Sequence, residues 1–257
     1  MPHYNLMVLL IKREVVGRYR GSLLGFLWSF IHPIFMLAVY TFVFGFVFKA
    51  RWGIEQENPI HFAAVLFTGL IAFNLFSECL SKAPALILTN INYVKKVVFP
   101  LHILPIVSLG AALFHTIVSL LILMLFIVLT GNSITLTSLA LPLIFMPFVL
   151  LIIGLSWFLA STGVFLRDIN QLIGIVLTAL LFLSPIFYPI SAVPETMQTY
   201  LYWNPLTFIV EQMRQVLIWG LWPDWFNLLL YACLSSFIAI TGWFWFIKTS
   251  KGFADVL

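Results

Sequence analysis

Charge is scarce in this sequence of 257 residues. Only 9% of the residues are Asp, Glu, Lys or Arg, whereas 62% are hydrophobic and the mean hydropathy is +1.09. A soluble globular protein carries charge on roughly a quarter of its residues, because its surface faces water. The composition therefore excludes a soluble globule and predicts an integral membrane protein.

Cysteine and the common catalytic motifs are also rare or missing. Cys79 and Cys233 fall at different predicted depths in the membrane, so we expect no disulfide between them. No glycine-rich turn ends in Gly-Lys-Ser/Thr, so the chain does not bind ATP through a P-loop. His-Glu-x-x-His, Gly-x-Ser-x-Gly and Cys-x-x-Cys are absent as well. We expect a non-enzymatic chain that holds no metal and no cofactor.

What the sequence does contain is a series of uncharged runs of membrane-spanning length. About 20 apolar residues cross a hydrocarbon core roughly 30 Å thick. Polar turn residues in "TGNSITLTS" divide the longest run into two. We predict one all-α membrane domain over residues 1–257, with an interfacial segment at 1–20 and six spans at about 27–48, 60–79, 101–129, 139–165, 170–190 and 225–247.

Basic residues distribute unevenly about these spans. Ten of the 13 Lys and Arg residues fall on the side that holds both termini, and three fall on the other side. Because basic loops are retained in the cytoplasm, this asymmetry predicts cytoplasmic termini. The net charge of +4 is then explained by topology, and nucleic acid is not an expected partner.

The N-terminal segment is amphipathic but imperfect. On a helix, Tyr4, Met7, Val8, Ile11 and Val15 share one apolar band, which predicts a helix on the membrane surface. The alternative is a basic flank that only sets the topology. Leucines outside the band need lipid or a protein partner: Leu6, Leu9 and Leu10.

The junction between this segment and the first span combines Arg18, Tyr19, Arg20 and Gly21. Glycines recur at every fourth position (17, 21 and 25). They form either a small-residue face for close helix contact or a bend into the first span, and the sequence favours neither.

The segment between the second and third spans, "SKAPALILTNINYVKKVVFP", is too polar to cross the membrane. Asn90 is suited to cap a short helix, and Pro100 disfavours helix at Phe99. This helix either docks on a soluble partner or only joins two spans.

Two further segments lie outside the spans. Arg167 and Asp168 occupy the turn between the fourth and fifth spans, as a topogenic or local ion pair. The segment 190–225 is rich in Tyr and Trp and is either an interfacial belt or two short helices, near 195–202 and 206–219, that dip back into the membrane. The histidines at 32, 102 and 115 are proton relays or, more simply, hydrogen-bonded packing residues.

Four motifs, taken in order, resemble the membrane subunits of ABC-2 type exporters that move O-antigen, capsule or teichoic-acid polysaccharides. They are "RYRGSLLGFLWSFIHP", "NINYVKKVVFPLHILP", "FLRDINQLIGIVL" with "LSPIFYPIS", and "YWNPLTFIVEQMRQVL". The resemblance covers nearly the whole chain. It implies the permease of an ATP-driven exporter of lipid-linked polysaccharide in the bacterial inner membrane, made of two copies of this chain and two copies of an ATPase chain that binds ATP and Mg²⁺.

The resemblance also assigns roles to residues. ATPase contact is implied for Thr89, Asn90, Asn92, Tyr93, Lys95 and Lys96. An external gate is implied around Tyr200, Tyr202, Trp203, Glu211 and Arg214. Aromatic side chains are expected to line the channel, because their ring faces suit sugar C–H groups.

Two other functions remain open at this point. An ABC-2 exporter of drugs or small lipids has the same scaffold, and neighbouring genes for glycosyltransferases distinguish the two. A membrane enzyme acting on lipid-linked sugars needs acids or histidines that converge near one membrane face, and the predicted topology shows no such cluster.

Overall fold

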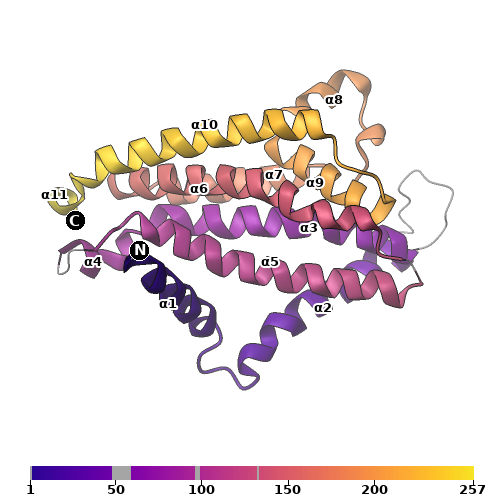
Figure 1. Cartoon of the computed structure of the whole chain (residues 1–257), viewed down its shortest axis with the longest axis horizontal. Coiled ribbons are helices and arrows are strands. Elements are labelled where there is room, and N and C mark those ends of the chain that lie inside the picture. The colour runs from indigo at the N-terminus through magenta and orange to yellow at the C-terminus, as the bar shows by residue number, and fades with distance from the viewer. Residues whose placement is uncertain (1, 48–58, 96–98, 132) are drawn as a thin grey trace.

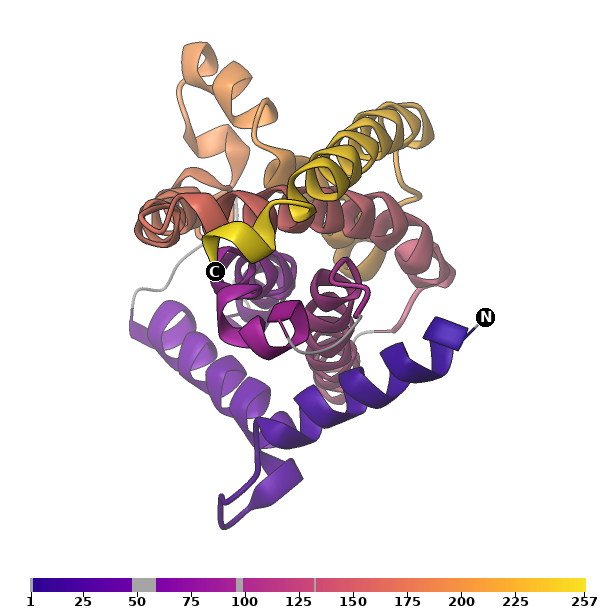
Figure 2. The same ribbon diagram turned by 90° about the vertical axis from the view of Figure 1, so that its left-hand side faces the viewer.

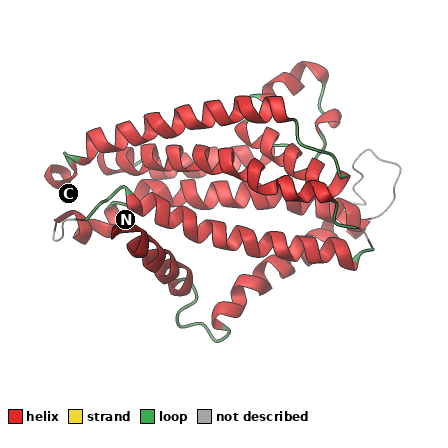
Figure 3. Ribbon diagram, in the orientation of Figure 1, coloured by secondary structure: helices red, strands yellow, loops and turns green. Residues whose placement is uncertain are grey.

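Apolar helices pack side by side throughout the part of the chain that the computed structural model describes, residues 2–47, 59–95, 99–131 and 133–257. Within these ranges every regular element is helical and no strand occurs, as predicted (Figure 3). Five of the described helices are long and apolar enough to cross a bilayer: Gly25–Phe44, His61–Ala85, Ile103–Leu129, Leu136–Phe165 and Trp225–Ser250.

Figure 1 labels the helices in chain order, and both termini lie at one end of the bundle, here called the terminal end. The opposite end, which carries α8, is called the far end. The helices are α1 (Pro2–Gly17), α2 (Trp28–Tyr40), α3 (Pro59–Lys82), α4 (Ile91–Lys95), α5 (Ile103–Leu129), α6 (Leu141–Phe165), α7 (Ile169–Leu183), α8 (Glu195–Tyr202), α9 (Pro205–Arg214), α10 (Trp225–Ser250) and α11 (Phe253–Val256). Two π-helical stretches continue helices, Thr41–Val47 after α2 and Gln215–Trp219 after α9.

The helix α3 lies in the centre of the bundle. Val65, Leu66 and Ala72 are fully buried, and α3 packs against α5, α9, α7 and the π-helical end of α2. Figure 2, which looks along the bundle from the terminal end, shows other helices on every side of α3. It runs from the far end to the terminal end, and among the described helices of spanning length it is the most deeply buried (Figure 1).

The helix α7 is short. Its 15 residues rise about 22 Å at 1.5 Å per residue, less than the hydrocarbon thickness of roughly 30 Å. The predicted fifth span extends to residue 190, but the helix ends at Leu183. Pro185 explains this end, because proline disfavours helical geometry in the residue before it, and Ser184 is extended with ψ of 147°.

The helices α6 and α10 approach each other closely through glycines. A Cβ atom added to Gly242 would lie 2.2 Å from the carbonyl oxygen of Gly154. Only glycine permits this separation, and small residues commonly let membrane helices come together. The pair forms one side of the bundle, in which α10 runs beside α6 for most of its length (Figure 1).

The N-terminal helix α1 packs across α5. Leu10 is buried there with Ile103 and Val107, and Ile11 lies over Gly110, whose missing side chain leaves room for it. Leu6 is half-buried against the same cluster, whereas Tyr4 and Leu9 are exposed. Two of the three leucines that needed a partner therefore find it in the protein.

The glycines of the junction produce a bend. Gly21 and Gly25 have φ of +88° and +49°, the left-handed region that favours glycine. A Cβ atom at 17, 21 or 25 would meet no described atom within 4 Å, and α1 ends at Gly17. Of the two alternatives, the structure supports the bend, and these glycines contact no other helix among the described residues.

Candidate functional site

A polar cavity of about 570 Å³ lies between α2, α3, α5 and the connection from α1 to α2. It occupies the half of the bundle nearer the terminal end. Its lining is aromatic, charged, amide- or hydroxyl-bearing at most positions: Arg18, Tyr19, Trp28, Ser29, His32, Asn74, Ser77, Glu78, Ser81, Lys82, His115, Thr116 and Ser119. Such a concentration of polar groups is exceptional in a chain with 9% charge, and intramembrane polar residues commonly mark a functional site.

Glu78 is the centre of the charged part of this cavity. Its Oε1 accepts from Arg18 Nη1 at 2.7 Å and from Lys82 Nζ at 3.0 Å. Lys82 also lies 3.7 Å from Glu14 of α1. Because Glu78 and Lys82 are on α3 and Arg18 follows α1, these pairs join the N-terminal segment to the central helix.

Tyr19 and His115 form the second contact across the cavity. The hydroxyl of Tyr19 hydrogen bonds with Nδ1 of His115 at 3.3 Å, and the two rings meet edge to face. Burial raises the pKa of Tyr19, although Arg18 opposes that shift. The tyrosine therefore remains a neutral hydroxyl at physiological pH.

The chemistry of the cavity suits binding better than catalysis. Indole, phenol and imidazole rings can stack on sugar faces, and the surrounding hydroxyl and amide groups can hydrogen bond to sugar hydroxyls. The carboxylate of Glu78 is already paired with two cations, so it is a weak candidate for a general base. No group of three or more potential metal ligands occurs among the described residues.

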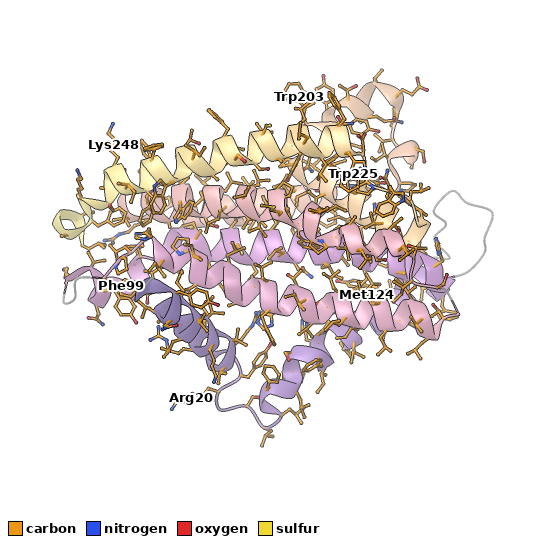
Figure 4. The ribbon with its side chains drawn as sticks, in the orientation of Figure 1. Arg20, Phe99, Met124, Trp203, Trp225 and Lys248 are labelled. Carbon is orange, nitrogen blue, oxygen red and sulfur yellow. The ribbon has the colours of Figure 1, made fainter. Side chains whose placement is uncertain are left out.

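The four junction residues predicted from sequence separate into two pairs. Arg18 and Tyr19 meet at the cavity. Arg20 is exposed and lies on the α1–α2 connection, away from the bundle (Figure 4), and Gly21 provides part of the bend.

The segment from Leu86 to Lys95, here called the connecting segment, packs against several other helices of the bundle. Leu86 and Ile87 are buried with Phe246 of α10 and Phe253 of α11. From α1, Arg13 donates to the hydroxyl of Tyr93 at 3.1 Å.

The predicted ATPase contacts have different surroundings in this segment. Thr89 and Asn90 each donate to the carbonyl of Leu86, so the amide of Asn90 bonds back to the preceding turn. The ring of Tyr93 stacks on Phe99 at 4.4 Å, and Lys95 donates to the backbone carbonyl of Leu257. Asn92 is exposed, and Lys96 lies outside the described residues.

The turn before α7 keeps its charged side chains in the open. Arg167 and Asp168 are both exposed, and no ion pair joins them in the described part of the chain. The backbone carbonyl of Asp168 accepts from Leu172 at the start of α7.

At the far end, the predicted gate residues divide by burial. Tyr200, Tyr202 and Trp203 on and after α8 are exposed, and Trp203 is 84% exposed (Figure 4). Arg214, in contrast, is fully buried and pairs with Glu211 at 2.7 Å. The helix α9 packs against α3 and α6, so it enters the bundle while α8 stays outside.

Sequence reasoning missed Glu78, Lys82, His32 and His115 as members of one site. Glu78 and Lys82 stand four residues apart, which on a helix places them on one face and could have indicated an ion pair. The contact of Glu78 with Arg18 spans 60 residues of sequence, and no local pattern predicts it.

Comparison with known proteins gives consistent matches over most of the chain. The sequence model of the ABC-2 type transporter family matches residues 5–218. The chain is 24% identical over 256 residues to the O-antigen export system permease protein RfbA of Klebsiella pneumoniae, covering 99% of this chain and 95% of that protein.

Two other relatives extend the comparison. The O-antigen export system permease protein RfbA of Myxococcus xanthus is 26% identical over 233 residues, covering 90% of this chain and 87% of that protein. The polysialic acid transport protein KpsM of Escherichia coli is 28% identical over 215 residues, covering 82% and 80%. A family match over most of the length, on an all-helical bundle with five helices of spanning length among its described residues, identifies this chain as a membrane protein of the ABC-2 type transporter family.

Proposed function

We propose that the chain is the channel-forming permease of an ATP-driven exporter that moves a lipid-linked, O-antigen-like polysaccharide across the bacterial inner membrane. The observation that carries this proposal is the polar and aromatic cavity of about 570 Å³ in an otherwise apolar bundle. Its groups suit a sugar chain, and the relatives named above are export permeases for polysaccharides. A separate ATPase supplies the energy, since this sequence contains no P-loop, and the proposed exporter consists of two copies of each chain.

The proposed topology has six crossings and cytoplasmic termini. The fifth crossing consists of α7 and the extended residues that follow it, because α7 alone is too short for a bilayer. The terminal end faces the cytoplasm, in keeping with the excess of Lys and Arg on that side. The polar cavity then opens toward the side where the sugar chain is made, and α8 faces the exit.

The connecting segment is the proposed contact with the ATPase. Asn92 and Lys95 are exposed on it, and one short 3₁₀ turn joins it to α3. ATP-driven closure of the partner dimer pushes on this segment and, through α3, opens a channel at the interface between two copies of the chain. The exposed aromatic residues of α8 form the outer gate.

Reconstitution of the permease with its ATPase in liposomes tests this function. We expect lipid-linked polysaccharide to reach the lumen only with ATP and an active partner. Asn74→Leu, which removes an exposed amide from the cavity, should reduce export, whereas Thr241→Leu, at an exposed position of α10 outside that cavity, should not. Export that persists without the ATPase contradicts the proposal.

Paired substitutions test the docking role of the connecting segment. Tyr93→Ala with Lys95→Ala should weaken co-purification of the ATPase and reduce export, because both residues lie on the proposed contact. Lys248→Ala at the exposed end of α10 is the control for loss of one positive charge. Unchanged association and transport in the double variant would remove this segment from the ATPase interface.

A membrane enzyme for lipid-linked sugars is the one alternative that a structural observation favours. Glu78, His32 and His115 line one cavity, which is the convergence that such an enzyme requires. Glu78→Gln distinguishes the two functions, because an enzyme that uses this acid loses covalent turnover of a lipid-linked sugar. A transporter leaves the lipid-linked sugar chemically unchanged with either residue.

A further inference from the structure

Arg214 is the most completely buried charged side chain described in the protein. It ends α9 and has no exposed surface. Its guanidinium donates to acceptors that include the carbonyl of Val65 at 3.1 Å, the carbonyl of Pro185 at 2.6 Å, the carbonyl of Ile186 at 3.1 Å, and Oε1 of Glu211 at 2.7 Å. These acceptors belong to α3, to the stretch after α7 and to α9 itself, so one side chain joins three elements.

The backbone at this site provides acceptors that only a multivalent donor can satisfy. Pro185 and Ile186 follow the end of α7, where carbonyls lack the helical partners of a continuing helix. A guanidinium has five N–H groups in a planar fork, whereas a lysine ammonium is a compact point charge with three. Arginine can therefore reach carbonyls on two separate elements and a carboxylate at the same time.

Gly69 makes the contact with α3 possible. A Cβ atom at this position would lie 3.1 Å from Nη2 of Arg214 and 3.3 Å from Val210. A side chain there would require Nη2, which donates to the carbonyl of Ile186, to shift by a few tenths of an ångström. Gly69 thus leaves the space that the guanidinium of Arg214 occupies against α3.

The opposite end of α3 leads into the connecting segment through one short turn. The α-helix ends at Lys82, and the 3₁₀ turn Ala83–Ala85 joins it to Leu86, the first residue of that segment. The helix is buried along most of its course, and Ala83 and Pro84 of the turn are buried as well, so this stretch is closely packed. A displacement of the connecting segment can therefore pass through the turn to α3 and to the carbonyl of Val65.

We propose that Arg214 is a positioning residue that fixes the outer gate to α3, so that a displacement of the connecting segment is transmitted to α8 and α9. This inference rests on the proposed function for its direction, since it takes the ATPase to act on the connecting segment. Asn204 strengthens the arrangement, because it caps α9 and donates to Ser184 Oγ at 2.8 Å beside the same carbonyls. The α8–α9 pair is therefore anchored at both ends of α9.

The experiment follows the outer gate without using the polysaccharide. Tyr200→Cys places a thiol on exposed α8 in a chain that also carries Cys79→Ala and Cys233→Ala. The permease is reconstituted with its ATPase, and the rate of reaction with a membrane-impermeant maleimide is measured with and without ATP. We expect ATP to change this rate, and we expect Arg214→Met to abolish that change while ATP hydrolysis continues.

A second variant covers the case in which Arg214→Met does not assemble. Gly69→Ala keeps the arginine but displaces its fork, so it should also abolish the ATP-dependent change in labelling. Gly174→Ala on α7, where an added Cβ atom meets nothing within 4 Å, is the matched control and should label like the parent chain.

Two results would overturn the proposal: ATP-dependent labelling that survives in Gly69→Ala and in assembled Arg214→Met, or a parent complex whose labelling does not respond to ATP. Failure of the proposed function has a different signature. In that case the parent complex moves no polysaccharide, while the labelling still reports whether α8 follows the ATPase.

Discussion

Two arginine–carboxylate pairs stand at opposite ends of α3 and have the same N–O distance of 2.7 Å. Arg18 and Glu78 meet at the polar cavity, with side chains that are 50% and 18% exposed. Arg214 and Glu211 meet at the far end, with side chains that are 0% and 23% exposed. The two ion pairs thus have equal N–O distances, but the arginine is half exposed in the first pair and fully buried in the second.

The surroundings decide what each pair is worth. An ion pair in contact with water contributes about 0–1 kcal/mol, because solvent competes for both charges and salt screens them. Removing one partner of a buried pair costs about 3–5 kcal/mol, since the groups left behind have no water to replace it. The pair at the cavity can open and close at little cost, whereas the pair at the far end holds its elements together.

This difference matches the two roles that the proposed mechanism needs. A cavity that admits and releases a sugar chain needs contacts that rearrange easily. A gate that moves together with α3 needs contacts to α3 that stay formed during the movement. The same helix carries both, and the following substitutions test the contrast between its two ends.

The largest effect is expected for Arg214→Met. This change leaves three backbone carbonyls and Glu211 without their donor, so the free energy of unfolding should fall by about 3–5 kcal/mol. Arg18→Met, the same substitution at the cavity, should lower it by less than about 1 kcal/mol. Thermal unfolding of both purified variants in one detergent measures the difference, and equal losses would contradict the comparison.

Gly69→Ala should have the next largest effect. The added methyl group meets the arginine fork and Val210 at 3.1 and 3.3 Å, and overpacking of this kind costs about 1–3 kcal/mol. Gly174→Ala in α7 meets open space and should stabilise its helix by up to about 1 kcal/mol. An equal loss of stability at both positions would show that the packing around Gly69 of α3 is no tighter than the packing around Gly174 of α7.

The fold could be predicted from sequence further than the sites could. Charge-free runs locate the long helices, because lipid imposes a length and an apolar composition on each crossing. The end of α7 was missed despite the visible Pro185, because the apolar composition continues past the point where the helix stops. Hydropathy shows which residues can lie in lipid, but it does not show where the helix ends.

The faces of the N-terminal helix illustrate a second limit. Tyr4 and Leu10 are both apolar, but only Leu10 packs on α5. A helical periodicity shows that a face is apolar and leaves open whether lipid or protein covers it. The position of Gly110 opposite Ile11 decides the matter, and that is a contact between residues about 100 positions apart.

Arg214 shows the same limit for a charged residue. The family resemblance groups it with the aromatic residues of an external gate and gives no sign of its burial, which is complete in the structure. Its carbonyl partners are backbone atoms of Val65, Pro185 and Ile186. Because every residue has a backbone carbonyl, the pattern of side chains in the sequence does not predict these contacts. The helical spacing of Glu211 and Arg214 was the only local signal of the pair.

A smaller effect, below about 1 kcal/mol, is expected for Glu78→Gln at the cavity. Because its partners Arg18 and Lys82 are partly exposed, this loss should disappear in 1 M salt, where the screening length is only about 3 Å. Glu211→Gln, beside the fully buried arginine, should keep its loss at both salt concentrations. Unfolding midpoints at low and high salt provide the test, and a salt-independent loss for Glu78→Gln would make the two pairs alike.

The smallest effect is expected for Tyr19→Phe. The change removes one hydroxyl that hydrogen bonds with His115 at 3.3 Å and keeps the ring in its contacts with Phe26 and His115. Because water in the cavity can replace a hydrogen bond of this length, the free energy of unfolding should fall by only about 0.5 kcal/mol. Tyr19→Ala also removes the ring and should cost clearly more. If Tyr19→Phe destabilises the protein as much as Gly69→Ala does, the contacts at the cavity are as strong as those at the far end of α3. That result would contradict the proposed difference between the two ends.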